Sequence, residues 1–436
     1  MKPYIGLWLG CLLAVGCGGG ETVTPPSPTI PPATAAKPDD PAAIAAWEAV
    51  KGKVDKTDGK VTSLTVEEAY LTNKDLQTEV ATAFAKLPLL PNLEKVVMAG
   101  QTITNDVLAQ FAGLTQLRDL QLENTTITDD GLAHLKGLEN LKLLNLRRSN
   151  IEGPGLAHLE PLKKLEVIML LYTNTTDDGI AHLKKLPKLR VIDLRGCGQV
   201  TENAMGHMKD IPTLEVIKFK NAPNVKSAGA AHLKGLENLK EVGFDDTNFD
   251  YDGIPHLLGL KNLRLLHLER LLITNNGLKE LTKLPELTGL WLRDTAITSD
   301  GMEHFKAFPH LSYLDLTENF VGGGLQHIVG LKELKSLSLN SSQVDDEGCK
   351  QIAQITGLEE LSLEDNPTIT DEGAAAFVAL TQLKTLNLQS TQVTDDLVNQ
   401  LKALTKLEDL NLKFTQVSED RVKQLRQDFP KLRVAY

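Results

Sequence analysis

The stretch LRDLQLENTTITDDGLAHLKGLEN, residues 117–140, changes its hydrophobic spacing halfway along. Leu120 and Leu122 alternate with polar residues, as in a strand with one buried side. Leu132 and Leu135 stand three residues apart, as on the buried face of a helix. The Thr and Asp residues between the two segments are typical of a turn and a helix start. The stretch therefore predicts one short strand, a turn and one short helix.

The same pattern recurs along most of the 436 residues, after a divergent first unit near Val61. The motif L-x-x-L-x-L begins, at intervals of 23 to 25 residues, at Leu93, Leu117, Leu141, Leu165, Leu189, Leu214, Leu239, Leu263, Leu287, Leu311, Leu334, Leu358, Leu383 and Leu407. Burying one leucine stabilises a protein by ~1.5–3 kcal/mol, whereas ordering each residue costs ~1–2 kcal/mol, so a single unit is unstable and the units must stack. We expect one array over residues 61–431, with about 15 units of about 24 residues, and a truncated unit over 432–436.

The repeat L-x-x-L-x-L-x-x-T-x-I-T-D-x-G-L resembles the leucine-rich repeat. It is similar to the cysteine-containing subclass of F-box adaptors, related to that of ribonuclease inhibitor, and to the repeats of bacterial surface lipoproteins. Cys197 stands where that subclass has its cysteine. Other copies carry a small polar residue there: Thr125, Ser149, Thr173, Thr247, Asn319 and Ser342. The resemblance implies an α/β solenoid, a horseshoe with a parallel β-sheet on its concave face and short helices on its convex face.

The chain opens with MKPYIGLWLGCLLAVGC, in which a short positive segment precedes an apolar run over residues 5–15. That run is too short to span a bilayer, so we expect residues 1–16 to be a cleaved export signal. Residues 13–17, LAVGC, resemble the lipobox of bacterial lipoproteins. The resemblance implies that Cys17 is acylated and holds the protein in a bacterial cell envelope, on a membrane face that the sequence leaves open. An ordinary signal peptide cut nearby is the alternative.

Residues 17–41 are rich in Pro, Thr, Ala and Gly, which predicts a tether. A cap over residues 42–60 should follow, opened by a helix that carries Ile44, Trp47 and Val50 and covers the first repeat. Residues 429–436 are expected to cover the other end of the array. Cys197 and Cys349 lie six repeats apart, too far for a disulfide, so packing alone should hold the fold together.

A formal net charge of -11 argues against nucleic acid as a partner, because nucleic-acid binders concentrate positive charge. Five pairs of acidic residues follow the strands: Asp129-Asp130, Asp177-Asp178, Asp345-Asp346, Asp371-Glu372 and Asp395-Asp396. Carboxylates at these places satisfy free N–H groups at a helix start, so we favour helix capping over calcium binding. We expect no metal and no cofactor.

Eight of the ten histidines occupy one position of the predicted helix: His134, His158, His182, His207, His232, His256, His304 and His327. Neighbouring helices stand ~8–10 Å apart, too far for a shared zinc ion, so duplication of one packing or hydrogen-bonding residue explains the column. A joint change of charge near pH 6 stays open as a hypothesis.

The residues between the strand leucines should face the concave surface, where they vary freely. His267, Trp291 and Asp315 fall on three successive strands, with Arg293 and Tyr313 alongside and Gly289 leaving room beside Tyr313. An exposed Trp with Tyr and Arg is the mixture that dominates interface energies, so this group is the leading candidate binding site, with incidental surface aromatics as the alternative. A second candidate patch is made of Met169, Leu171, Tyr172, Arg147, Arg195 and Lys220.

Catalysis requires a nucleophile, a base and an orienting group in a shielded pocket, and we find no motif of that kind. The expected function is therefore non-catalytic binding of a protein, or else of a glycan, by a monomer held at the membrane through its N-terminal lipid alone. A soluble adaptor of the F-box type is the alternative, although a signal and a tether occupy the place of an F-box. An enzyme built on the solenoid ranks last.

Overall fold

Each repeat begins with a short strand, because two leucines that alternate with polar residues bury one side of the chain. The computed structural model describes residues 37–436. The predicted signal peptide, Cys17 and the tether up to residue 36 lie outside the described residues. Residues 38–436 form one unit, which is described by itself below.

The strands of this unit are three to seven residues long. They are β1 (Lys53–Thr57), β2 (Lys60–Val66), β3 (Lys95–Ala99), β4 (Asp119–Glu123), β5 (Leu143–Asn145), β6 (Val167–Met169), β7 (Val191–Asp193), β8 (Val216–Lys218), β9 (Glu241–Gly243), β10 (Leu265–His267), β11 (Gly289–Trp291), β12 (Tyr313–Asp315), β13 (Ser336–Ser338), β14 (Glu360–Ser362), β15 (Thr385–Asn387), β16 (Asp409–Asn411) and β17 (Arg433–Ala435).

The second half of each repeat is an α-helix in some copies and a tighter 3₁₀-helix, labelled η, in others. The α-helices are α1 (Pro41–Ala49), α2 (Glu68–Leu71), α3 (Gln77–Lys86), α4 (Asn105–Ala109), α5 (Asp177–His182), α6 (Asn203–Met208), α7 (Ile254–Leu257), α8 (Asn275–Leu281), α9 (Asp346–Ile352), α10 (Asp371–Ala374), α11 (Asp395–Leu401) and α12 (Glu419–Asp428). The 3₁₀-helices are η1 (Lys74–Leu76), η2 (Leu87–Leu89), η3 (Asp129–Leu135), η4 (Pro154–Leu159), η5 (Leu183–Lys185), η6 (Ser227–Gly235), η7 (Tyr251–Gly253), η8 (Ser299–Ala307), η9 (Gly322–His327) and η10 (Ala375–Ala379). Segments this short tolerate the 3₁₀ form, a distinction that leucine spacing did not predict.

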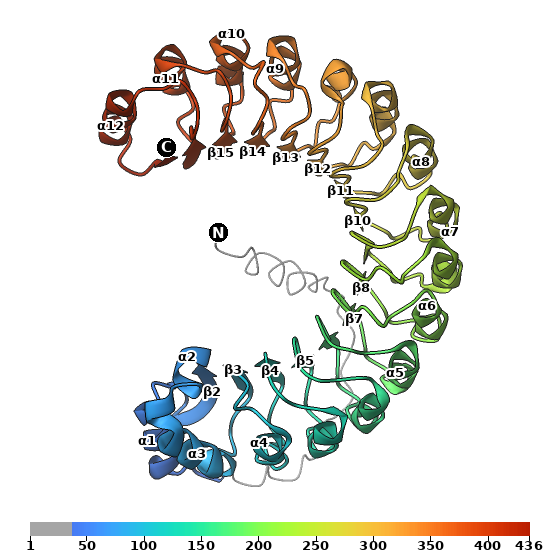
Figure 1. Ribbon diagram of the computed structural model, residues 1–436, viewed down its shortest axis with the longest axis vertical. Helices are drawn as coiled ribbons and strands as arrows, with labels where there is room; N and C mark the ends of the chain where they lie inside the picture. Colours follow the sequence, from blue (N-terminus) through green and yellow to red (C-terminus); the bar gives the residue numbers. More distant parts are fainter. Residues whose placement is uncertain (1–36) are drawn as a thin grey trace, which may run out of the picture. The chain divides into compact units, whose positions relative to one another are not determined.

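The strands join into one 17-stranded sheet within residues 37–436. β1 pairs with β2 in antiparallel fashion, and from β2 to β17 each strand pairs in parallel with the next. The register keeps equivalent residues opposite one another, as in the series Leu266, Leu290 and Leu314. The strands line the inner side of an arc and the helices its outer side, which confirms the predicted arrangement (Figure 1).

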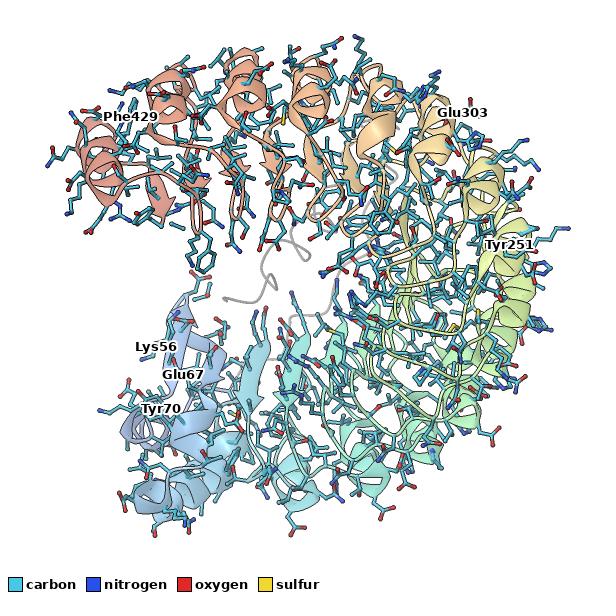
Figure 2. The ribbon with its side chains drawn as sticks, turned by 45° about the horizontal axis from the view of Figure 1, so that its top comes forward. Lys56, Glu67, Tyr70, Tyr251, Glu303 and Phe429 are labelled. Atoms are coloured by element: carbon cyan, nitrogen blue, oxygen red, sulfur yellow. The ribbon has the colours of Figure 1, made fainter. Side chains whose placement is uncertain are left out.

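The repeated leucines form the core that the sequence predicted. In the repeat that begins at Leu117, seven apolar side chains have no exposed surface: Leu117, Leu120, Leu122, Ile127, Leu132, Leu135 and Leu138. Equivalent residues of the other repeats are buried in the same way, so the core is one continuous column from cap to end. On the outer side, Tyr251 and Glu303 project away from this core (Figure 2).

The small polar position of the repeat also behaves as predicted, because its side chains satisfy backbone carbonyls at the buried turn. The Thr173 hydroxyl donates to the carbonyl of Leu170 at 2.8 Å. The Asn319 amide donates to the carbonyls of Leu292 and Leu316, and so ties two repeats together. Cys197 and Cys349 are both free and buried. Burial raises the pKa of the Cys197 thiol, which keeps it protonated.

The acidic pairs do something other than the predicted capping in most repeats. The first carboxylate of a pair reaches across to the next repeat: Asp177 accepts from the backbone N–H of Thr201 at 2.8 Å, and Asp371 from that of Thr394 at 2.8 Å. Each also accepts from the hydroxyl of the same threonine. Asp345 is the member that caps its own helix, accepting from the N–H of Gly348 at 2.8 Å. The aspartates therefore link adjacent repeats, because the N–H groups within reach belong to the neighbour.

The N-terminal cap is larger than a single helix. Asp40 caps α1 and Pro41 opens it, and Trp47 is fully buried against the edge of the Phe84 ring, with ring centroids 5.2 Å apart. Leucine spacing gave no sign of the β1–β2 hairpin, whose antiparallel pairing continues the sheet beyond the first repeat. Because β1 lies at the end of the sheet, the hairpin and α1 together cover the first repeat.

Candidate binding surface on the concave face

The turn after each strand requires one residue with left-handed backbone geometry. This residue has a positive φ in successive repeats: Asn124, Arg148, Tyr172, Gly196, Asn221, Asp246, Arg270, Asp294, Glu318, Ser341, Asp365, Ser390 and Phe414. Asn, Asp, Gly and Ser adopt this conformation with little strain, whereas bulky side chains cost about 1 kcal/mol or more. We call this residue and the one before it the rim of the concave face.

The leading candidate group forms a stack rather than an exposed patch. Trp291 lies between His267, with ring centroids 3.9 Å apart, and Tyr313, at 4.3 Å. The expectation of an exposed Trp291 is wrong, since only 8% of it is accessible. Gly289 makes room for the Trp291 ring and for Leu265, because a Cβ there would fall 2.8 Å from a ring carbon of Trp291 and 2.8 Å from a methyl carbon of Leu265, and none of the three nearest atoms belongs to Tyr313.

The other members of that group have separate partners. Arg293 pairs with Glu318 on the rim of the next repeat. Asp315 accepts from the backbone N–H of Thr317 at 2.9 Å, and its burial raises the pKa of its carboxyl. His267 and Asp315 lie on either side of Trp291 in the register, two strands apart, as expected. The structure thus brings His267, Trp291 and Tyr313 together, and the two charged residues flank them.

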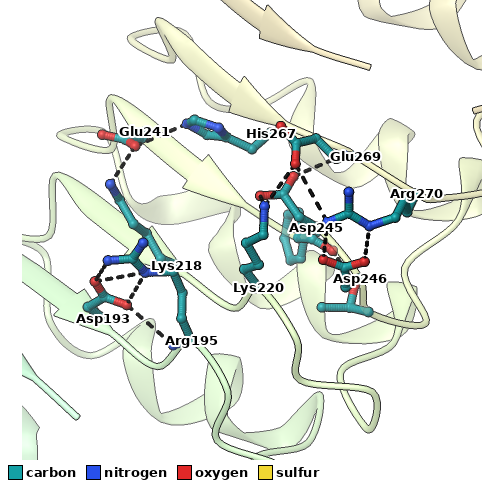
Figure 3. Close-up of polar contacts among 12 residues, drawn as sticks. Asp193, Arg195, Lys218, Lys220, Glu241, Asp245, Asp246, His267, Glu269 and Arg270 are labelled. Carbon is teal, nitrogen blue, oxygen red and sulfur yellow. Dashed lines mark hydrogen bonds and ion pairs between the residues drawn. The ribbon is translucent and has the colours of Figure 1, made fainter. Parts of the chain in front are cut away.

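A network of charged side chains adjoins the stack on β8, β9 and β10, and the sequence reading had overlooked it. Glu241 accepts from His267 at 3.1 Å and pairs with Lys218 at 2.9 Å (Figure 3). Burial alone would raise the pKa of Glu241, but the hydrogen bond with His267 and the charge of Lys218 outweigh it and lower the pKa to about 2. Glu241 therefore stays ionised although it is almost completely buried, with only 6% of its surface exposed.

The rim continues this network. Lys220 reaches over two repeats to Glu269 at 2.8 Å and lies 3.8 Å from Asp245 (Figure 3). Arg270 makes a two-pronged contact with Asp246 in the preceding repeat. Burial raises the pKa of Asp245, against the opposing charge of His267. Such contacts between repeats are possible because the concave curvature brings side chains of different strands together.

Asp193 and Arg195 complete the network on the N-terminal side. Their side chains pair at 2.7 Å, and Asp193 is 3% exposed (Figure 3). Burial alone would lower the pKa of Arg195, but the hydrogen bond to Asp193 keeps it raised. Removing ions from water costs several kcal/mol for each group, so this network has a structural cost that an array of neutral residues would avoid.

The residues of the second candidate patch do not form one surface in the structure. Tyr172 is 45% exposed, and the guanidinium carbons of Arg147 and Arg148 lie 5.8 and 5.5 Å from its ring centroid. Leu171 is buried, at 6% exposure, and Met169 is half-buried. Arg195 and Lys220 belong to the charged network instead. Arg148, a neighbour of Tyr172, was not among the predicted site residues, and only its turn position could have drawn attention to it.

The rim also divides by charge. From β5 to β8 it carries cations and no carboxylate: Arg147, Arg148, Arg195 and Lys220. From β9 to β14 carboxylates outnumber the cations Arg270 and Arg293: Asp245, Asp246, Glu269, Asp294, Glu318, Glu364 and Asp365. The concave face thus has a positive and a negative part.

Comparison with known proteins agrees with this architecture. The family described as Leucine Rich repeat matches residues 332–353 and 356–378. A solved leucine-rich-repeat protein of Leptospira interrogans superposes with a TM-score of 0.54, at 19% identity, over 80% of this chain and 92% of that one. The fold is a leucine-rich-repeat solenoid.

The structure of an internalin from Listeria monocytogenes is 18% identical over 91% of this chain and 94% of that one, with a TM-score of 0.49. No curated protein matches the chain.

Beyond its concave face, the solenoid has an apolar flank. Leu272 and Phe320 are 73% and 63% exposed, at the same position two repeats apart, with exposed Ala296 between them. A hollow of about 790 Å³ lies beside Leu272, lined also by Phe249, Asp250 and Arg270 among others. Exposed apolar side chains on a repeat flank carry no periodic signal, so the sequence reading missed them.

The described part of the solenoid holds no group of three or more His, Cys, Asp or Glu side chains arranged for a metal ion. Over residues 37–436, no helix combines the length and the apolar character needed to cross a membrane. The predicted histidine column lies on the outer helices, where its members are exposed or half-exposed. Its pH role stays a prediction.

Proposed function

We propose that this solenoid is a non-catalytic recognition protein that binds another protein through its concave face. The observation that carries the proposal is the charged network from Asp193 to Arg270, whose carboxylates Asp193, Glu241 and Asp245 are buried. The leucine core does not require charge at the last residue of each strand, because β13 to β16 build the same sheet with Ser or Asn at the position that Asp193, Lys218 and His267 hold in β7, β8 and β10. Charged groups that the leucine core does not require are explained if they act on a partner.

The charge division of the rim supports a protein partner. Complementary charge steers association and fixes the register of a complex, and it rejects partners of the wrong charge pattern. A rim that is positive over β5–β8 and negative over β9–β14 presents such a pattern along one direction. A partner with the opposite order of charges would dock in a single orientation.

Site-specific photocrosslinking in the producing cell tests the proposal. A photoreactive benzoylphenylalanine replaces Met169, half-buried on the concave face, or His134, exposed on the outer side, as the matched control. We expect one protein to crosslink at position 169 and not at 134, and the yield to fall when the salt concentration rises. Equal labelling at both positions, or none at 169, would refute the proposal.

A glycan is the second candidate ligand, and one observation favours it. Side chains of β14 to β16 and their turns form an amide and hydroxyl network, in which the Asn387 amide donates to Ser362 at 3.1 Å and to Glu364 at 3.0 Å. Gln389 and Asn411 extend it. Amide and hydroxyl groups suit the hydroxyls of sugars. We therefore expect the protein to bind neutral oligosaccharides on a glycan array, and the Asn387→Leu variant to lose this binding.

We further propose that the protein is exported and held in a bacterial cell envelope by acyl chains on Cys17. The support is the sequence of residues 1–17 alone. Radiolabelled palmitate should enter the wild-type protein and not the Cys17→Ser variant, which should appear in the soluble fraction. Unlabelled wild-type protein would favour an ordinary signal peptide.

A further inference from the structure

The rim residues Arg148 and Tyr172 differ from Arg270 and Glu318, two other large polar residues at the left-handed turn position. Arg270 and Glu318 occupy that position too, and each has an ion pair with the neighbouring repeat, to Asp246 and Arg293. Within residues 37–436, Arg148 forms no ion pair. Internal contacts thus account for Arg270 and Glu318, but not for Arg148.

Tyr172 is likewise held in place without being covered. Its φ is +56°, a conformation that Asn124 and Asn221 provide at equivalent positions with less strain. The next repeat has Gly196 there, where a Cβ would fall 2.2 Å from a Tyr172 ring carbon. The missing side chain therefore lets the ring lie across the next repeat, and 45% of Tyr172 remains exposed.

The surroundings of the ring are cationic, but among the cations that the structure describes there, Arg148 alone has no ion pair. Arg147 pairs with Glu123 at 2.7 Å and Arg195 with Asp193 at 2.7 Å, whereas Arg148 is exposed and lies 5.5 Å from the ring centroid. One available guanidinium beside an exposed ring suits a carboxylate with an apolar neighbour. A polyanion such as a sulfated glycan would require several unpaired cations.

We propose that Arg148 and Tyr172 form a docking site for an acidic segment of a protein partner. The Arg148 guanidinium binds a carboxylate of that segment, and the Tyr172 ring packs against the adjacent apolar side chain. The strained conformation at both positions is retained because Asn, which fits the turn better, offers neither group. This inference rests on the proposed function and names the partner chemistry at one end of the concave face.

The test uses the full-length protein and a fluorescein-labelled peptide of alternating Glu and Leu, with a Gln–Leu peptide as its neutral counterpart. Arg148→Asn and Tyr172→Asn place at the turn the residue that Asn124 has in the same column. Phe414→Asn is the matched control, because Phe414 has the same left-handed geometry and is 80% exposed at the other end of the array. Fluorescence anisotropy measures binding, and thermal unfolding measures stability.

We expect the acidic peptide to bind the wild-type protein and the neutral peptide not to bind. Arg148→Asn and Tyr172→Asn should each weaken binding by about tenfold, while Phe414→Asn leaves it unchanged. All three variants should unfold at a higher temperature than the wild type, because each relieves backbone strain. Loss of binding therefore cannot be ascribed to unfolding.

Four results would overturn the inference. One is equal binding of the acidic and neutral peptides, and another is a lower unfolding temperature of Tyr172→Asn, which would make the ring structural. The third is that the wild-type protein binds a heparin oligosaccharide but not the acidic peptide, and that Arg148→Asn abolishes the binding of heparin. A partner that crosslinks at position 169 and is unaffected by both substitutions would overturn this inference alone. Absence of any crosslinked partner would remove the proposed function itself.

Discussion

The two halves of the concave face solve the same folding problem with different side chains. Both have the buried leucine column and the same parallel register. The strands β7–β10 carry the buried carboxylates Asp193 and Glu241, whereas β13–β16 carry hydroxyls and amides beside carboxylates that are not buried. Glu241 and Glu360 show the difference, since they hold the same strand position. Glu241 is buried between Lys218 and His267, whereas Glu360 is exposed and accepts from Ser336 at 2.9 Å. The fold therefore tolerates either chemistry, and the choice between them is not made by the core.

The stacked rings at the junction of the two halves should give the largest effect. Trp291→Ala removes a buried ring that contacts both His267 and Tyr313, and we expect the free energy of unfolding to fall by about 3–5 kcal/mol. Trp291→Phe keeps a stacked ring and should lose markedly less. Urea denaturation followed by circular dichroism measures both. A loss below about 1 kcal/mol in the alanine variant would contradict the packing described here.

Glu241 and Glu360, which hold the same strand position, test the comparison between the two halves directly. Glu241→Ala leaves Lys218 without its buried partner, and we expect a destabilisation of about 3 kcal/mol. Glu360→Ala removes an exposed contact and should change stability by less than about 0.5 kcal/mol. Similar losses in the two variants, measured by the same denaturation, would show that the halves do not differ in this respect.

The ionisation of Glu241 should also affect how the stability of the protein depends on pH. Its pKa is about 2 in the folded state against 4.5 for an ordinary glutamate, so its ionised form stabilises the fold by about 3 kcal/mol above pH 4.5. This contribution is lost as the pH falls through the folded pKa. Unfolding midpoints from pH 6 to 2 should therefore drop more steeply for the wild type than for Glu241→Gln. Parallel profiles would contradict the assigned ionisation.

The links between repeats should behave alike in both halves. Asp177→Leu and Asp371→Leu each leave a threonine N–H and hydroxyl without an acceptor, and we expect each to cost about 1–2 kcal/mol. Asn should be tolerated, because Asn105 makes the same link to Thr128, accepting from its N–H at 3.0 Å and donating to its hydroxyl at 2.8 Å. Thermal unfolding of the Leu and Asn variants measures the difference. A large difference between the two positions would mean that the halves diverge beyond the concave face.

The sequence predicted the repeat, the parallel sheet, the curved arrangement and the buried leucines, because each depends on the spacing of apolar residues within one unit. The role of Thr173 and Asn319 at the turn was also accessible, since their partners lie in their own or the adjacent repeat. The aspartates were misread for a related reason. A carboxylate at a helix start can serve its own helix or the next repeat, and only the stacking geometry selects Thr201 as the partner of Asp177.

The sequence predicted which residues of the candidate site lie on the concave face, but not how buried they are or which side chains they contact. Position within the repeat identified Trp291 as a concave residue, but its burial depends on the lack of a side chain at Gly289 and on the rings of the adjoining strands. The pairing of Lys220 with Glu269 spans two repeats and depends on curvature, which spacing along the chain cannot supply. Local periodicity thus determined which residues are buried and which face the concave side. The tertiary structure alone decided which charges pair, which rings stack and which cation is left available, because most of these contacts join side chains of different repeats, whose approach depends on how the repeats stack.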